Sequence, residues 1–80
     1  MGPIKHTTGM TRADLSRDCL AELRLWPGCE TVEGLGVLGG SNGGFSVHVI
    51  DYGGAKKKVA DRAVRCIQRE KLRWYHLKME

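Results

Sequence analysis

Apolar residues recur with a helical period in the segment that follows Thr11. Spacings of four, four and three residues gather them on one side of a helix: Leu15, Cys19, Leu23 and Trp26. Thr11 and Asp14 have the spacing of a helix N-cap and its reciprocating acid. Proline cannot continue a helix and glycine accepts the turn that follows, so Pro27 and Gly28 end it. The pattern predicts a first helix between Thr11 and Pro27.

The residues of segment 45–52 alternate between two faces, as in a β-strand. One face holds Phe45, Val47 and Val49, and the other holds Ser46, His48 and Ile50. Segment 30–38 alternates more weakly and contains two glycines. The link "GGSNGG" joins the two segments, and its Gly and Asn residues tolerate positive φ. The pattern predicts a β-hairpin.

A second helical pattern begins near Ala55 and runs through "AKKKVADRAVRCIQREKL". On a helical wheel one broad face collects Val59, Ala60, Ala63, Val64, Cys66 and Ile67. A narrow row on the opposite side, the basic stripe, collects Lys58, Arg62, Arg65 and Arg69 at i, i+4, i+7 and i+11. The following "RWYHLK" alternates large apolar residues with polar ones and predicts a short final strand.

These elements predict an α+β fold. We expect a small two-layer sandwich in α-β-β-α-β order, with a three-stranded sheet and both helices on one of its faces. A helical crossover brings the last strand to the sheet, so that strand is expected to run parallel to its neighbour. Eighty residues are enough for one core, and residues 11–80 are expected to form a single small domain. The preceding residues lack a hydrophobic period, so residues 1–10 are expected to form a flexible N-terminal tail.

The composition is that of an ordinary globular protein, with 41% hydrophobic and 28% charged residues. No run approaches the roughly 18 apolar residues needed to cross a bilayer, and the start lacks a basic-then-apolar signal segment. We therefore expect a cytoplasmic protein without a membrane partner. The three cysteines, an odd number with no close pair, favour a reduced protein over a disulfide framework.

The residues that could bind a metal or catalyse a reaction lack a recognisable spacing. Cys19, Cys29 and Cys66, taken with His48 and His76, contain no Cys-x-x-Cys or His-x3-His pattern. Apolar buried thiols are the simpler interpretation. No paired carboxylates or Ser-His set stands out either. The sequence therefore predicts no metal site, no cofactor and no enzymatic activity.

Two glycine-rich segments raise the question of phosphate binding. No lysine follows "GGSNGG" as in a Walker loop, and no helix opens after it, so turn formation is favoured there. Segment 51–54 differs, because it leads from a strand into a helix whose first N–H groups favour an anion. Lys56, Lys57 and Lys58 oppose the helix dipole at this end. A bound phosphate would relieve that cost and solvated lysines also tolerate it, so both interpretations stay open.

The basic stripe is the main candidate for function, because regularly spaced cations can follow a phosphate backbone. Trp74 and Tyr75, placed with Arg73 just after the helix, could stack on an unpaired base. The predicted site for a nucleic acid or another polyanion comprises Lys56, Lys57, Lys58, Arg62, Arg65, Arg69 and Arg73. Any solvated helix also shows a charged row, and both aromatics are natural core residues. The net charge of +4 is too small to decide between these interpretations.

The alternative function is that of a protein–protein interaction module. A sheet covered by helices on one face leaves the other face open, and Ile50 and Tyr52, with either Trp74 or Tyr75, are expected there. A contiguous apolar patch on that face would call for a partner or a second copy. The concrete form of this alternative is a homodimer that pairs through the open sheet face or an edge strand.

Overall fold

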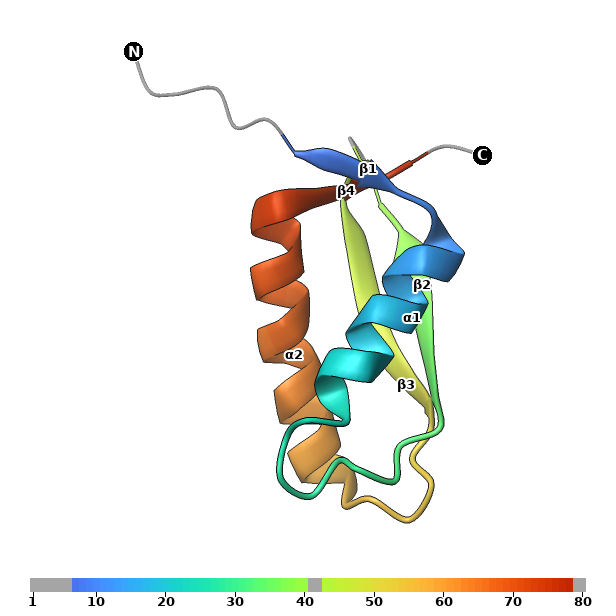
Figure 1. The fold of residues 1–80 in the computed structure, drawn as a ribbon, viewed down its shortest axis with the longest axis vertical. Helices are drawn as coiled ribbons and strands as arrows, with labels where there is room; N and C mark the ends of the chain where they lie inside the picture. Colours follow the sequence, from blue (N-terminus) through green and yellow to red (C-terminus); the bar gives the residue numbers. More distant parts are fainter. Residues whose placement is uncertain (1–6, 41–42, 79–80) are drawn as a thin grey trace.

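Two helices and four short strands make up the protein, in a computed structural model that describes residues 7–40 and 43–78. Along the chain the elements are β1 (Thr8–Met10), α1 (Arg12–Leu23), β2 (Gly34–Gly39), β3 (Phe45–Asp51), α2 (Lys57–Trp74) and β4 (Tyr75–Leu77) (Figure 1). β2 and β3 form an antiparallel hairpin, whereas β1 and β4 form a separate parallel pair. The protein is therefore a small α+β domain with two two-stranded sheets.

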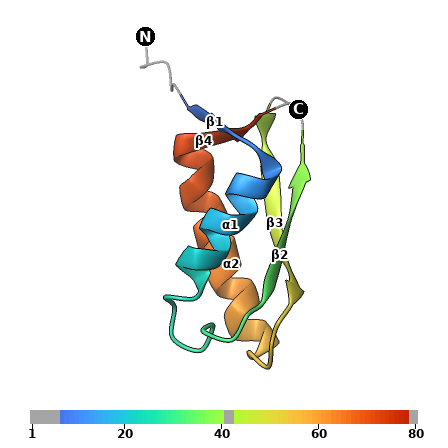
Figure 2. The same ribbon diagram turned by 45° about the vertical axis from the view of Figure 1, so that its right-hand side comes forward.

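The two helices lie on one face of the β2–β3 hairpin (Figures 1 and 2). α1 contacts β2 and α2, and α2 contacts β3. The β1–β4 pair crosses the end of this layer at which α1 begins and α2 ends. This arrangement leaves the side of α2 that faces away from the hairpin at the surface.

The core fills the space between the helices and the hairpin. Its buried members include Leu15, Cys19 and Leu23 of α1, Leu35, Val37, Phe45 and Val47 of the hairpin, and Ala60, Ala63, Val64 and Ile67 of α2. Ser46, His48 and Ile50, the outward set of β3, are exposed. The predicted hairpin and its two faces are therefore confirmed. Within its link, Gly43 has a φ of 78°, whereas Ser41 and Asn42 lie outside the described residues.

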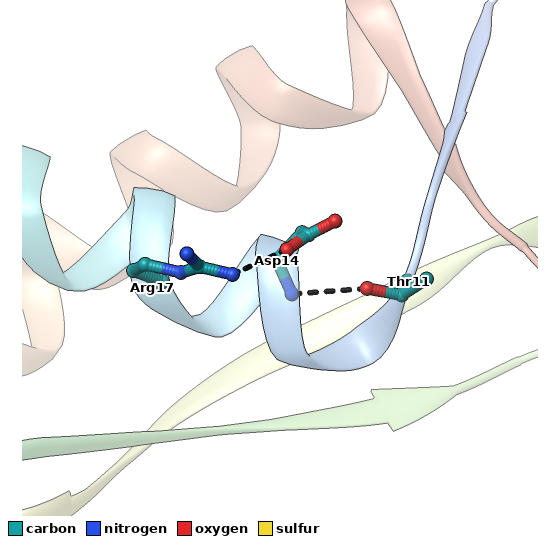
Figure 3. A network of polar contacts seen from close by, with 3 residues as sticks. All are labelled: Thr11, Asp14 and Arg17. Carbon is teal, nitrogen blue, oxygen red and sulfur yellow. Dashed lines mark hydrogen bonds and ion pairs between the residues drawn. The ribbon is translucent and has the colours of Figure 1, made fainter.

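The first helix begins where its capping pattern predicts. The Thr11 hydroxyl accepts a hydrogen bond from the Asp14 backbone N–H at 3.1 Å, and Arg17 forms an ion pair with the Asp14 carboxylate (Figure 3). The cap satisfies one of the N–H groups that a helix start leaves free. The helix ends at Leu23, so Trp26 lies beyond it rather than on its apolar side.

The second helix runs from Lys57 to Trp74, so it begins two residues later than predicted and continues further. Its apolar face is also narrower than the sequence suggested, because Val59 is 41% exposed and Cys66 is exposed. With 3.6 residues per turn, both positions fall on the flanks of the buried side rather than at its centre.

The predicted three-stranded sheet is wrong. β4 is parallel to its neighbour as expected, but that neighbour is β1, with Thr8 opposite Tyr75 and Met10 opposite Leu77. Because α2 stays helical through Trp74, β4 begins only at Tyr75, and its three residues lie across the end of the hairpin rather than along its edge. Residues 8–10, assigned from the sequence to a tail over 1–10, thus belong to the fold, and residues 1–6 lie outside the described residues.

Candidate functional site

The basic stripe lies on the solvent-exposed side of α2. Its four members, Lys58, Arg62, Arg65 and Arg69, are all exposed. The buried residues of the helix lie opposite them: Ala60, Ala63, Val64 and Ile67. At a rise of 1.5 Å per residue the stripe is roughly 16 Å long. The helical winding and the outward orientation on which the predicted site depends are therefore present.

The remaining three residues of the predicted site lie at the two ends of α2. Lys56 is the N-cap residue and Lys57 the first helical residue, and both are exposed. Arg73 is exposed in the last turn of the helix, not after the helix as predicted. In all, α2 contains seven basic and two acidic residues, so this one helix carries +5 while the whole chain carries +4.

Intramolecular ion pairs do not neutralise the stripe. Among the residues that the structure describes, acidic side chains pair with Arg17, Lys71 and Arg73. Arg73 lies 3.7 Å from the carboxylate of Glu70, which sets it apart from the rest of the predicted site. The four cations of the stripe, by contrast, face solvent without a described acidic partner.

The junction between β3 and α2 is built as a tight turn. Gly53 and Gly54 have φ values of 56° and 91°, in the left-handed region that favours glycine. The Gly53 N–H donates to the Asp51 carboxylate at 2.9 Å, and the Ala55 N–H donates to the Tyr52 carbonyl at 2.9 Å. These bonds use N–H groups that an anion-binding loop would present to its ligand, so turn formation accounts for both glycines.

The structure does not bring the predicted stacking aromatics onto the stripe. Trp74 is 60% exposed but lies roughly 150° around the helix from the stripe, where its indole N–H donates to Glu70 at 3.1 Å. Tyr75 packs against the core, and the Lys71 ammonium lies 5.6 Å from the centre of its ring. Neither side chain is therefore placed to stack beside a ligand on the basic stripe.

A groove between β3 and α2 adjoins the stripe. It has a volume of about 460 Å³ and is lined by Val47, His48, Asp61, Val64, Arg65 and Gln68. The Gln68 side-chain oxygen accepts a hydrogen bond from the Val47 N–H at 2.8 Å, and the Tyr52 hydroxyl donates to Asp61 at 2.6 Å. That hydrogen bond to a carboxylate raises the pKa of Tyr52.

Sequence reasoning missed His48 and Gln68 as candidate binding residues. They come from a strand and a helix separated by a turn, and only the packing of β3 against α2 brings them to one groove. The sequence signal available was the outward position of His48 on its strand, which marks exposure but not proximity to Arg65.

The metal-ligating side chains are scattered over the part of the chain that the structure describes, residues 7–40 and 43–78. No group of three or more His, Cys, Asp or Glu residues gathers there as a metal site would require. Cys19 and Cys29 are fully buried, and burial raises the pKa of the Cys19 thiol to about 11. Over the same residues, no helix is both long and apolar enough to cross a bilayer.

The outer face of the hairpin is open but only partly apolar. Leu38 and Ile50 are 60% and 66% exposed there. Tyr52, expected on this face, instead packs toward the core and bonds to α2. A helix side chain is hydrogen-bonded to each edge of the hairpin. The Ser16 hydroxyl of α1 donates to the Leu35 carbonyl of β2, and the Gln68 side-chain oxygen of α2 accepts from the Val47 N–H of β3.

Comparison with protein-family models, with curated proteins and with solved structures finds no match to this chain.

Proposed function

We propose that the protein binds a nucleic acid through the basic stripe of α2. The observation that carries the proposal is the row of four exposed cations without described ion-pair partners. Cations of this kind hold only mobile counterions from solution. A nucleic acid carries condensed cations on its phosphates, and lysine and arginine side chains that neutralise those phosphates release the cations, which is the main source of sequence-independent nucleic-acid binding.

The length of the stripe suits a nucleic-acid strand. Successive members lie about 6 Å or 4.5 Å apart along the helix axis. Phosphates of one strand repeat every 3.4 Å along B-form DNA, so a stripe of roughly 16 Å runs beside about five phosphates. Long, flexible arginine side chains accommodate the difference in spacing, and four phosphate contacts are expected.

Self-association through the hairpin has less support. The open face lacks the contribution that Tyr52 was expected to make, and each edge carries a hydrogen bond to a helix side chain. Added strands pair through free backbone groups on an edge, so edge pairing would have to displace Ser16 or Gln68.

Fluorescence anisotropy with a short labelled oligonucleotide of mixed sequence tests the proposal. For four phosphate contacts, the logarithm of the binding constant should fall against the logarithm of salt concentration with a slope of about −3 to −4. Replacing Arg62, Arg65 and Arg69 together by Gln should reduce the steepness of this slope by about 2 to 3 units.

A control variant of equal charge separates the stripe from net charge. Arg12, Arg17 and Lys78 are exposed basic residues outside α2, and their joint replacement by Gln removes the same three positive charges. The control should keep the wild-type slope. Equal losses in both triple variants, or a slope near zero for the wild-type protein, would overturn the proposal.

A further inference from the structure

We propose that Tyr52 keeps the basic stripe free of an ion pair within the protein, by holding the Asp61 carboxylate away from Arg65. The Tyr52 hydroxyl donates a hydrogen bond of 2.6 Å to one carboxylate oxygen of Asp61. The proposal rests on the function proposed above and adds the residue that leaves Arg65 available to a phosphate. Tyr52 acts through Asp61 and touches no ligand, so it is a positioning residue of the binding surface.

The position of Asp61 on α2 favours an ion pair with the stripe. Residues three or four apart face each other on a helix, and Asp61 has Lys58 three residues before it and Arg65 four residues after it. An acid four residues before a base is the more favourable order, because it also agrees with the helix dipole. Asp61 and Arg65 line the same groove. The sequence of this helix by itself therefore favours a pair between them.

Acidic residues elsewhere in the protein do form pairs at such spacings. Asp14 pairs with Arg17 in α1, and the Glu70 carboxylate lies 3.7 Å from the Arg73 guanidinium in α2. In the part of the chain that the structure describes, Asp61 pairs with neither of its basic neighbours at these spacings. What distinguishes Asp61 from the other two acids is the hydrogen bond from Tyr52.

The fold fixes the position of the Tyr52 hydroxyl. Tyr52 directly follows β3, is half-buried and packs against the core, so its ring stays on the side of α2 that faces the hairpin. A hydrogen bond to an ionised carboxylate stabilises more than an exposed ion pair between helix neighbours. Asp61 therefore remains bound to Tyr52, and the guanidinium of Arg65 remains unpaired.

Tyr52→Phe removes the hydroxyl and keeps the ring, and therefore tests this role. The freed Asp61 should pair with Arg65, which must then leave that pair to bind a phosphate. In about 0.1 M salt the affinity for an oligonucleotide of mixed sequence should fall about two- to eightfold. The smaller factor corresponds to breaking one helical ion pair and the larger one to losing one of four phosphate contacts, which would make the salt slope less steep by about 0.9.

Three further variants sharpen the result. Tyr75→Phe is the matched control, because it removes the hydroxyl of the chain's other tyrosine, and it should bind as the wild type does. Asparagine at position 61 carries no charge, so Tyr52→Phe should have no effect on affinity when combined with Asp61→Asn. It should likewise have no effect when combined with Arg65→Gln. A merely structural role of Tyr52 would lower the affinity by the same factor in every background.

Nuclear magnetic resonance tests the same pairing in the free protein. A hydrogen bond to Asp61 should slow the exchange of the Arg65 Nε–H proton with water in Tyr52→Phe, relative to the wild type. Circular dichroism confirms that each variant is folded, which is expected because Tyr52→Phe removes a single hydrogen bond and no apolar contact.

The outcomes separate the two proposals. If Tyr52→Phe binds as the wild type does, or loses affinity equally in the Asp61→Asn background, the role of Tyr52 is overturned and the phosphate-binding stripe stays in place. A loss that persists with Arg65→Gln overturns Arg65 as the partner of Asp61. A wild-type protein that does not bind the oligonucleotide overturns the proposed function instead. The exchange measurement then decides alone, and an unchanged Arg65 signal in Tyr52→Phe overturns the inference.

Discussion

Alanine substitutions at Gly53 and Gly54 should separate backbone strain from steric overlap at the junction between β3 and α2. Both glycines have positive φ, so an alanine is strained at either position. At Gly54 an added Cβ would meet no atom within 4 Å. At Gly53 it would lie 1.8 Å from the Thr31 carbonyl oxygen. The two neighbouring sites therefore share the strain and differ in the overlap.

The expected costs follow from that geometry. A left-handed conformation costs a non-glycine residue about 1–2 kcal/mol, which is the expected effect of Gly54→Ala. Gly53→Ala adds a displacement of the Thr31 backbone by roughly 1 Å, and this displacement disturbs the adjacent, fully buried Val32. We expect a loss of about 3–5 kcal/mol, against a total stability of about 4–12 kcal/mol for a chain of this length.

Urea unfolding followed by far-ultraviolet circular dichroism measures both variants. For a small domain with a denaturant slope of about 1 kcal/mol per molar urea, Gly54→Ala should lower the midpoint by about 1–2 M and Gly53→Ala by about 3 M or more. Equal shifts in the two variants would refute the reasoning, because the contact with Thr31 would then have no energetic effect.

A thiol reagent should alkylate exposed Cys66 quickly and reach Cys19 and Cys29 only after unfolding, because burial excludes the reagent and raises the pKa of both thiols. Mass spectrometry after a short pulse checks this, and fast labelling of Cys19 would contradict the packing of α1. Lys71→Met removes the 2.8 Å ion pair with Glu22 that joins the helices, and should lower the free energy of unfolding by about 1 kcal/mol at pH 7. Burial disfavours the charge on Lys71, but the hydrogen bond and charge of Glu22 outweigh it and raise its pKa. Below pH 10.5, the ordinary pKa of lysine, the variant should be less stable than the wild type by this full amount. The difference in stability should disappear as the pH rises through the raised pKa of Lys71. A difference that persists above that pKa would contradict the assignment.

Local patterns in the sequence predicted the elements that depend on their own residues. The cap at Thr11, the alternation of β3 and the periodicity of α2 each act over one or two turns or a few strand positions. Such local signals are sufficient to place α1, the hairpin and the exposed basic stripe, because the fold buries the same face of each element that the sequence pattern makes apolar.

Features that depend on tertiary contacts could not be predicted from the sequence. β1 has only three residues, with no hydrophobic period, and it is a strand because β4 lies beside it. The groove likewise exists only because β3 and α2 pack together, and the position of the His48 ring depends on a glycine across the hairpin. No spacing along the chain carries this information.

The pairing of β1 with β4 constrains the order in which the chain assembles. It joins Thr8 to Tyr75, and closing so long a loop costs about 4 kcal/mol of chain entropy beyond a constant term. Two strands of three residues each form too few hydrogen bonds, at about 1 kcal/mol apiece, to offset that loss unaided. We therefore expect the pair to close after the hairpin and helices have docked, when Met10, Tyr75 and Leu77 can also pack against the core.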